Sequence, residues 1–186
     1  SRIVMSAHAI NQGHYPDTRN AQQTDFFFIH NADPEQVAEE LVTLVKYRLP
    51  KAYNQPLSNI QVLTPMQRSV VGAANLNMML QQALNTTTLG ISRGGTTYKL
   101  GDRVMQIRNN YDKNVYNGDI GTVEKVNIED RTLCVNFDNN LVEYEATELD
   151  ELTLAYASTI HKSQGSEYPI VVIPVLMTHF VMLQRS

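Results

Sequence analysis

The sequence has a single cysteine, Cys134, and no tryptophan. One cysteine cannot form an internal disulfide, so a reducing compartment suits the chain best. Any metal site would have to be built from histidines and carboxylates. His8, His14, His30 and His179 are too dispersed to indicate one. We therefore expect no metal ligands in this sequence.

Long apolar runs and an excess of positive charge are also missing. The longest apolar stretch, Tyr168 to Met177, is interrupted by Pro169 and Pro174 and is too short to span a bilayer. The first residues lack the basic-then-apolar pattern of a signal peptide. A net charge of −4 gives no overall field that attracts nucleic acid, so a nucleic-acid surface would have to be local. These features predict a cytoplasmic protein without a membrane partner.

The remaining composition is that of an ordinary globular protein. Of the 186 residues, 42% are apolar and 18% are charged, which is enough to bury a core and excludes disorder. The length allows one domain, or one domain with a small insertion.

The first ninety residues alternate between strand and helix patterns. We expect a short helix over Arg2–Asn11, a buried strand over Phe26–Ile29 and a second over Ile60–Leu63. A helix should begin with Asp33 as N-cap, close a capping box through Gln36 and end at Pro50. Another is expected over Gln67–Leu84. This alternation predicts a parallel sheet with helices packed on it.

The texture changes between about Ile91 and Asp150. Short β-rich segments recur with tight turns between them, including Asn117-Gly118-Asp119, which predicts a small β-barrel. The expected strands are Asp102–Arg108, Ile120–Ile128, Leu133–Phe137 and Leu141–Tyr144. From Leu152 the first pattern returns, with an expected helix over Ala155–Gln164 and a strand over Ile170–Val175. The sequence thus predicts one α/β domain interrupted by an inserted barrel.

The segment Leu154–Pro169 concentrates hydroxyls, an imidazole, an ammonium and a carboxylate just before a predicted strand. Such loops usually bind ligands in open α/β sheets. On a helix, Thr159 and Lys162 would share a face and could hold neighbouring phosphates of one nucleic-acid strand. The alternative is a capped amphipathic helix with Lys162 in solvent and His161 as a structural hydrogen-bonding residue.

Residues Thr159 to Glu167 read Thr-Ile-His-Lys-Ser-Gln-Gly-Ser-Glu. This segment resembles motif V of superfamily 1 helicases, closest to the RecD/TraA group of DNA helicases. Other parts resemble the same group in the same order: Asn75-Leu76-Asn77 with Leu80-Gln81, Gly101 to Gln106, Asn109 to Asp112 and Asn117 to Gly121. The similarity covers essentially the whole chain.

The resemblance implies an α/β fold: a second RecA-like motor domain at residues 1–91 and 150–186, incomplete at its carboxyl end, with an SH3-like barrel inserted at 92–149. By position, Thr159, His161 and Lys162 would face single-stranded DNA. Glu167 would accept hydrogen bonds from the nucleotide sugar, since a carboxylate offers two acceptors. The loop around it would be shaped by Gln164, Gly165 and Ser166.

Leu63 to Arg68 resembles motif IV, which in related motors supplies an arginine to the γ-phosphate. Arg68 would stabilise charge on the transferred phosphoryl group. Gln67 would lie at the nucleotide and Thr64 at the DNA. The alternative for Arg68 is a solvent-exposed arginine at a helix start.

In the barrel, Asn109, Asn110 and Tyr111 are the DNA-contact candidates. Residues 98–114 carry two more positive than negative charges, and Tyr111 and Tyr116 could stack on bases. An ordinary solvated barrel face explains these residues equally well, and the two asparagines could simply support a turn.

No glycine is followed by lysine, so the sequence has no phosphate loop, and no apolar strand ends in Asp-Glu to hold magnesium. The resemblance places both features in an N-terminal motor domain of the same polypeptide, and a further catalytic arginine beyond Ser186. It implies an ATP- and Mg²⁺-dependent DNA helicase that moves 5′ to 3′ on single-stranded DNA, with nuclease or recombination subunits as possible partners. This chain alone should not hydrolyse ATP.

Two other classes remain open. A pure interaction module would use the barrel to dock a protein or DNA without motor activity. A metal-dependent nuclease would need clustered carboxylates, for which the acidic candidates are Glu143, Glu145, Glu148, Asp150 and Glu151. A solvated strand and turn explain these acidic residues better.

Overall fold

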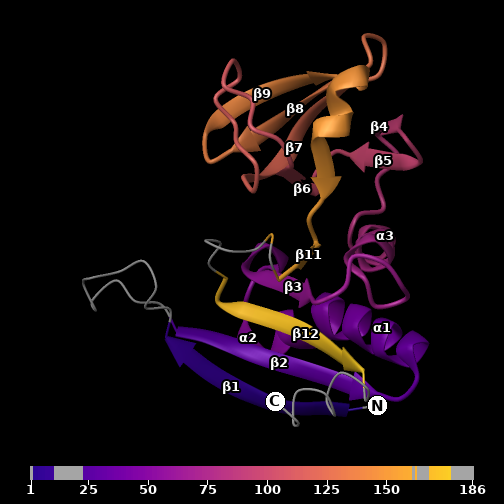
Figure 1. Cartoon of the computed structure of the whole chain (residues 1–186), viewed down its shortest axis with the longest axis vertical. Helices are drawn as coiled ribbons and strands as arrows, with labels where there is room; N and C mark the ends of the chain where they lie inside the picture. Colours follow the sequence, from indigo (N-terminus) through magenta and orange to yellow (C-terminus); the bar gives the residue numbers. More distant parts are fainter. Residues whose placement is uncertain (1, 11–22, 161, 163–167, 177–186) are drawn as a thin grey trace. The chain divides into compact units, whose positions relative to one another are not determined.

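The computed structural model describes residues 2–10, 23–160, 162 and 168–176. The chain divides into two compact units, which we call the sheet unit (Ser1–Met79 with Ala157–Ser186) and the barrel unit (Leu80–Tyr156). The barrel unit is thus inserted in the sequence of the sheet unit, as Figure 1 shows by its colours. It includes the predicted insertion, residues 92–149, whose exact bounds stay a prediction.

The sheet unit is built on five strands in the order β1-β2-β12-β3-β11. β1 pairs antiparallel with β2. The other three pairings, β2 with β12, β12 with β3 and β3 with β11, are parallel. Their bounds are β1 Arg2–Ile10, β2 Gln23–Asn31, β3 Ile60–Thr64, β11 Ala157–Thr159 and β12 Ile170–Leu176. β12 lies at the centre of the sheet and is mostly buried, which explains its continuous apolar run.

Helix α1 (Pro34–Thr43) begins as predicted, because the Asp33 side chain accepts a hydrogen bond from the Glu35 N–H at 3.0 Å. Gln36 does not close a capping box; its side chain accepts from Asn31 at 2.8 Å. The predicted end at Pro50 is wrong. A π-helical turn (Leu44–Arg48) leads directly into α2 (Leu49–Tyr53), so the helical segment continues through Pro50, next to the change of hydrogen-bond register at the π turn.

Three other predicted helices need correction. Residues 2–10 form strand β1, because the backbone of β2 provides a partner that local propensity does not reveal. Helix α3 is Ala73–Leu84 and begins six residues later than predicted, after an irregular loop over residues 65–72. In place of a helix over 155–164, residues 157–159 form β11 beside β3, and Lys162 lies in a turn.

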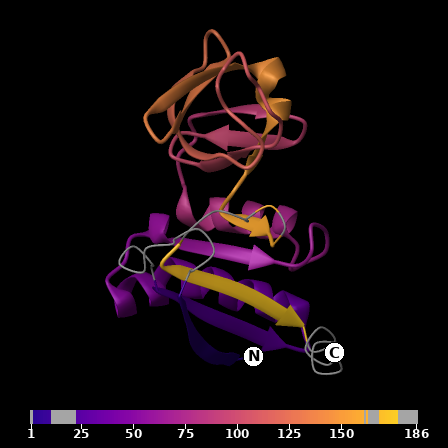
Figure 2. The same ribbon diagram turned by 60° about the vertical axis from the view of Figure 1, so that its left-hand side comes forward.

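The barrel unit contains an antiparallel sheet in the order β10-β6-β7-β8-β9 and a separate hairpin, β4-β5. Figure 2 shows the sheet curling on itself. The four predicted strands are confirmed as β6 Arg103–Gln106, β7 Ile120–Asn127, β8 Thr132–Phe137 and β9 Asn140–Glu145. The prediction missed β4 Gly90–Arg93, β5 Thr96–Lys99 and β10 Leu152–Leu154. Two 3-10 turns, Leu57–Asn59 in the sheet unit and Ala146–Glu151 in the barrel unit, complete the elements.

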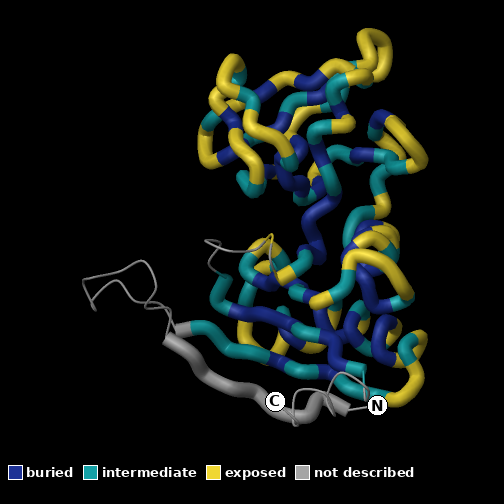
Figure 3. Tube along the Cα trace, in the orientation of Figure 1, coloured by how far each residue is buried: buried dark blue, intermediate teal, exposed yellow. Residues whose placement is uncertain are grey.

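Each unit has its own core, shown dark blue in Figure 3. In the sheet unit Leu41, Leu76 and Val172 are fully buried. In the barrel unit the alternate residues of β8 point inward, among them Leu133 and Val135. The predicted α/β class, a largely parallel sheet with an inserted small β-structure, is confirmed. Within the described ranges, no helix is both long and apolar enough to cross a bilayer.

Candidate functional site

The candidate site in the sheet unit lies at the carboxyl ends of β3 and β11. Thr64 and Thr159 are register partners in this parallel pair. The Ile160 N–H donates to the Thr64 carbonyl at 3.2 Å, and the Lys162 N–H donates to the Thr159 carbonyl at 3.1 Å. The two segments that resemble motifs IV and V therefore leave the sheet side by side, at the edge where open α/β sheets bind ligands.

Thr64 is completely buried. Its hydroxyl donates to the Val71 carbonyl at 2.7 Å and accepts from the Met66 N–H at 3.3 Å. These bonds close the loop over residues 65–72 at both ends. In the structure, the side chain of Thr64 therefore holds this loop. Its contact with DNA stays a prediction.

The same loop presents Gln67 and Arg68, both exposed. Ala74 donates its backbone N–H to the Gln67 carbonyl at 3.1 Å, which fixes the loop against the first turn of α3. Ser69 has a φ of 94°, a conformation that costs energy for a residue with a side chain. The arginine is therefore carried by a defined loop and not by the helix start that the sequence suggested.

Gly72 explains how this loop packs so tightly. A Cβ atom at this position would lie 2.5 Å from both the backbone carbon and the oxygen of Arg68. No real side chain tolerates that distance, so only glycine lets the Arg68 backbone approach α3 here. Gly72 therefore positions the Arg68 backbone through close packing.

Asn77 fastens the other segment. Its side-chain Nδ2 donates to the Ala157 carbonyl at 2.9 Å, and its Oδ1 accepts from the Ala157 N–H at 2.7 Å. β11 lies at an edge of the sheet, so among the described strands Ala157 has only β3 beside it. The asparagine occupies that place and fixes the start of the segment that leads to Thr159 and Lys162.

The remaining candidates in this segment fall outside the described residues: His161, Gln164, Gly165, Ser166 and Glu167. Thr159 is half-buried, and the Lys162 side chain is exposed. The structure therefore brings together Thr64, Gln67, Arg68, Thr159 and Lys162 at one edge of the sheet. The roles assigned to all these residues stay predictions.

The barrel candidates Asn109 and Asn110 both support a turn. Asn109 Oδ1 accepts from the Asn117 N–H at 3.0 Å. Asn110 Oδ1 accepts from the Lys113 N–H at 3.1 Å, and its Nδ2 donates to Glu151 at 3.2 Å. These bonds hold the loop over residues 109–117 and thereby present Tyr111.

Tyr111 is 75% exposed, the largest exposed fraction among the large apolar side chains of the described residues. Its ring meets the Tyr116 ring edge to face, with centroids 5.6 Å apart. Tyr116 is itself held by Asn114 at 2.9 Å. An aromatic ring supported in this way at a loop tip can stack on a nucleic-acid base.

Most cations of residues 98–114 are engaged inside the barrel unit. Lys99 donates to the Asn85 carbonyl at 3.3 Å, and Arg103 lies over the Tyr156 ring at 5.9 Å. Lys113 pairs with Glu148 at 2.6 Å, and this contact holds the pKa of Glu148 below its usual value. Arg108 is exposed. The sequence surplus of charge therefore overstates the positive surface beside Tyr111.

A buried carboxylate that the sequence reading did not single out organises the barrel unit. Asp102 is fully buried, and its two oxygens accept four hydrogen bonds. The donors are Gln81 at 2.6 Å, Asn85 at 2.8 Å, the Tyr156 hydroxyl at 2.6 Å and the Lys99 N–H at 2.7 Å. Burial, together with Asp102, raises the pKa of the Tyr156 hydroxyl. The only sequence signal was that Gln81 and Asp102 both lie in segments that resemble the RecD/TraA group.

Three of the five acidic residues considered for a nuclease have structural partners in the rest of the barrel unit. Glu151 accepts from Gln106 at 2.8 Å, Asp150 pairs with Arg93 at 2.9 Å, and Glu148 pairs with Lys113. Over the residues that the structure describes, no three His, Cys, Asp or Glu side chains come together as a metal site would require. These carboxylates join the 3-10 turn after β9 to the rest of the barrel unit.

Comparison with protein families agrees with this geometry. Residues 76–137 match the SH3 domain of ATP-dependent RecD-like DNA helicases, and residues 154–186 match the UvrD-like helicase C-terminal domain. By its domains the chain is therefore of the helicase class, and the predicted RecA-like class with an SH3-like insertion is confirmed.

Two curated relatives narrow the class. The chain is 39% identical over 127 residues to an ATP-dependent RecD2 DNA helicase of Deinococcus radiodurans, covering 68% of this chain and 18% of the relative. It is 29% identical over 141 residues to the RecBCD enzyme subunit RecD of Haemophilus influenzae, covering 70% and 20%. The chain belongs to the RecD-like helicases, and it spans about a fifth of the length of these relatives.

Solved structures of the Pif1 helicase from Bacteroides also resemble the chain. One, in complex with ADP-AlF3 and single-stranded DNA, has a TM-score of 0.48 at 21% identity and covers 73% of this chain and 38% of its own. An unliganded structure has a TM-score of 0.41 at 24% identity and covers 68% and 48%.

Proposed function

We propose that this chain forms part of the motor of an ATP-dependent DNA helicase, which couples ATP hydrolysis to 5′-to-3′ movement along single-stranded DNA. The observation that carries the proposal is the pairing of Thr64 with Thr159, because it makes the motif IV-like and motif V-like segments leave the sheet together. The relative named an ATP-dependent RecD2 DNA helicase supports the same activity.

Within this motor, Arg68 and Gln67 would face the phosphates of ATP from their exposed loop. The guanidinium of Arg68 fits a γ-phosphate, since it offers several donors and a permanent positive charge. The hydrogen-bond donors of Arg68 and Gln67 fit a triphosphate. Bound ATP would supply the phosphoryl group whose transfer releases energy. The ligands for Mg²⁺, like the phosphate loop, would come from an N-terminal motor domain of the same polypeptide.

The motif V-like segment would touch both ligands. Thr159, His161 and Lys162 would contact the DNA backbone, and Gln164 to Glu167 the nucleotide. A single segment that contacts both ligands can transmit closure of the nucleotide site to the grip on DNA. Thr64, Asn109, Asn110 and Tyr111 would add contacts to the strand. We further propose that residues 92–149 form the inserted barrel and that the protein is cytoplasmic. Because one relative is a subunit of the RecBCD enzyme, we propose recombination or nuclease subunits as partners.

The chain and the longer helicase polypeptide that contains it provide the test. The 186-residue chain should release no phosphate from ATP with or without single-stranded DNA. In the longer polypeptide, Arg68→Ala should lower kcat about 10³-fold, as loss of an arginine finger does, while DNA binding persists. Arg48→Ala, at another exposed arginine of the sheet unit, is the matched control. DNA-stimulated ATPase activity of the isolated chain, or equal rates for both variants, would contradict the proposal.

A further inference from the structure

The barrel unit carries a pocket on the side of β7 and β8 that the motor function does not use. It has a volume of about 760 Å³. Its apolar lining, the walls, consists of Leu89, Leu100, Val126, Ile128 and Leu133, of which Leu133 is buried in the core; its polar lining, the rim, consists of Glu124, Lys125, Glu129, Cys134, Glu143, Asn127 and Thr132. We call this set the acidic groove. All of its residues lie within the barrel unit.

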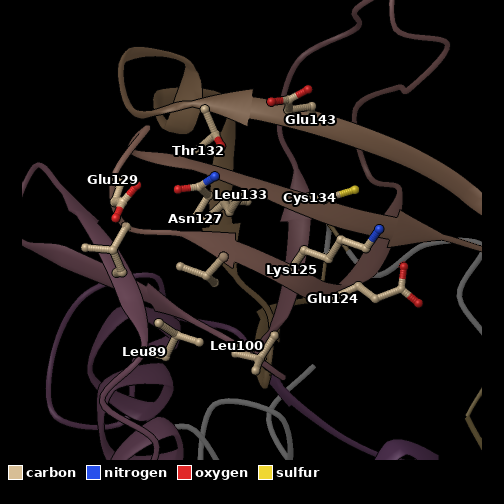
Figure 4. Close-up of a pocket in the computed structure, with 12 residues that line it drawn as sticks. Leu89, Leu100, Glu124, Lys125, Asn127, Glu129, Thr132, Leu133, Cys134 and Glu143 are labelled. Atoms are coloured by element: carbon tan, nitrogen blue, oxygen red, sulfur yellow. The ribbon is translucent and has the colours of Figure 1, made fainter.

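The walls expose apolar surface that a lone domain would normally bury. Ile128 is 52% exposed and Leu89 is 37% exposed. Leu89 and Leu100 lie together at one end of the groove, where the Leu100 N–H donates to the Leu89 carbonyl at 2.9 Å (Figure 4). Apolar side chains that line a concave surface and are rimmed by charged groups are typical of a site for another molecule.

The rim decides the chemistry of that molecule. The rim contains three glutamates and one lysine, so the groove carries a net negative charge. Lys125, Cys134 and Glu143 are successive register partners across β7, β8 and β9, so Cys134 lies between the lysine and Glu143. Figure 4 shows Lys125 beside Glu124 and away from Glu129 and Glu143. Burial raises the pKa of the Cys134 thiol, and Glu124 and Glu143 act in the same direction. A phosphate backbone would be repelled here, whereas a cationic segment would be attracted.

We propose that the acidic groove docks a segment of a partner protein in which lysine or arginine side chains alternate with aliphatic ones. The aliphatic side chains would cover Ile128 and Leu89, and the cations would pair with Glu124, Glu129 and Glu143. The proposal does not depend on motor activity, because none of these residues belongs to the candidate nucleotide or DNA contacts.

Binding is measured with a short synthetic peptide that alternates leucine and lysine, labelled with fluorescein and titrated with the 186-residue chain. Ile128→Ser should weaken binding about tenfold or more, because the exposed half of this aliphatic side chain would be buried against the bound peptide. Leu141→Ser is the matched control, since Leu141 is 53% exposed in the same unit and lies outside the groove. Glu124→Gln should weaken binding of the peptide and make that binding less dependent on salt. Asp112→Asn should change neither the affinity nor its salt dependence.

The only cysteine of the chain provides an independent readout, because Cys134 lies on the rim. Saturating peptide should slow its reaction with a maleimide. No measurable binding, equal weakening by Ile128→Ser and Leu141→Ser, or equal binding of a leucine–aspartate peptide would overturn the proposal. The proposal would also be overturned if the chain sedimented as a dimer and Ile128→Ser made it a monomer, because the groove would then bind a second copy of the chain. If Cys134 reacted slowly with the maleimide in the longer helicase polypeptide without peptide, the groove would be occupied by another segment of that protein, which would likewise overturn the proposal.

Discussion

The amide side chain of Asn77 makes both backbone hydrogen bonds of Ala157, at 2.9 Å to its carbonyl and 2.7 Å from its N–H. These two residues are eighty positions apart in the sequence. A single helical side chain thus takes the place of a sixth strand at the edge of the sheet. The contact fixes the entry to the motif V-like segment, which neither residue type alone would indicate.

Removing this contact should destabilise the sheet unit. Asn77→Ala leaves the carbonyl and N–H of Ala157 buried without partners, which costs roughly 1 to 3 kcal/mol each. Asn77→Asp keeps the acceptor but places a buried carboxylate oxygen against the Ala157 carbonyl, so its effect should be at least as large. Urea unfolding followed by tyrosine fluorescence measures both. An Asn77→Ala chain as stable as the parent would show that the edge of β11 does not need the side chain.

Asp102→Asn tests the buried carboxylate of the barrel unit. Each oxygen of Asp102 accepts two hydrogen bonds, so an amide nitrogen in either place faces two donors. The free energy of unfolding should fall by about 2 to 4 kcal/mol, given that hydrogen bonds to charged groups contribute about 1.5 to 3 kcal/mol. Asp112→Asn, at an exposed aspartate in the same unit, should change it by less than about 0.5 kcal/mol. Equal effects would refute a special role for Asp102.

The barrel unit should lose stability in alkali. Burial raises the pKa of Tyr98 from 10 to about 12, and it also raises those of Tyr144 and Tyr156. Between pH 10 and pH 12 the unfolded chain therefore releases these protons while the folded chain keeps them, so the free energy of unfolding falls as pH rises. Below pH 10 the contribution is complete. Denaturant titrations across this range measure the slope.

A matched pair of variants assigns that slope. Tyr98→Phe should flatten the pH dependence, although it also removes the 2.8 Å hydrogen bond to the Leu152 carbonyl and lowers stability at neutral pH. Tyr111→Phe, at an exposed tyrosine, should leave the slope unchanged. Equal slopes for the parent and Tyr98→Phe would exclude Tyr98 as a source.

Gly72→Ala should displace the loop that carries Arg68. The added Cβ would lie 2.5 Å from the Arg68 backbone, so the loop must move or open. Overpacking of this kind costs about 1 to 3 kcal/mol. Trypsin cleavage after Arg68, followed by mass spectrometry, should become faster. Gly95→Ala is the control, because its Cβ meets nothing within 4 Å and only its φ of 84° is strained; an unchanged rate after Arg68 in Gly72→Ala would contradict the packing argument.

Tyr111→Ala should weaken binding of single-stranded DNA to the chain. Loss of one stacked base costs about 1 to 3 kcal/mol, which is roughly a 5- to 150-fold change in Kd. With two or three phosphate contacts, the log-log salt slope should be about −1.4 to −2.1, and Lys162→Ala should reduce it. Tyr47→Ala, at a tyrosine 59% exposed in the sheet unit, is the control. Fluorescence anisotropy that gives a slope near zero would argue against DNA contact.

The sequence was sufficient where the signal is local. The cap at Asp33, the apolar run of β12 and the tight turns of the barrel all follow from side-chain chemistry within a few residues. The change of texture after Ile91 likewise indicated the inserted β-structure. The motif-like residues around Thr159 indicated the helicase family, because a spacing of nine chemically specific positions is rarely produced by packing alone.

What the sequence alone determined was therefore the class of the fold, its insertion and its family. Only the tertiary structure decided that residues 2–10 are a strand and that Ala157–Thr159 joins the sheet, because a backbone partner distant in sequence outweighs local helix propensity. It also decided that Thr64 and Asp102 are buried and hold the chain internally. Hydrogen bonds between residues far apart in the sequence leave no periodic signal, and for that reason they had to be seen in three dimensions.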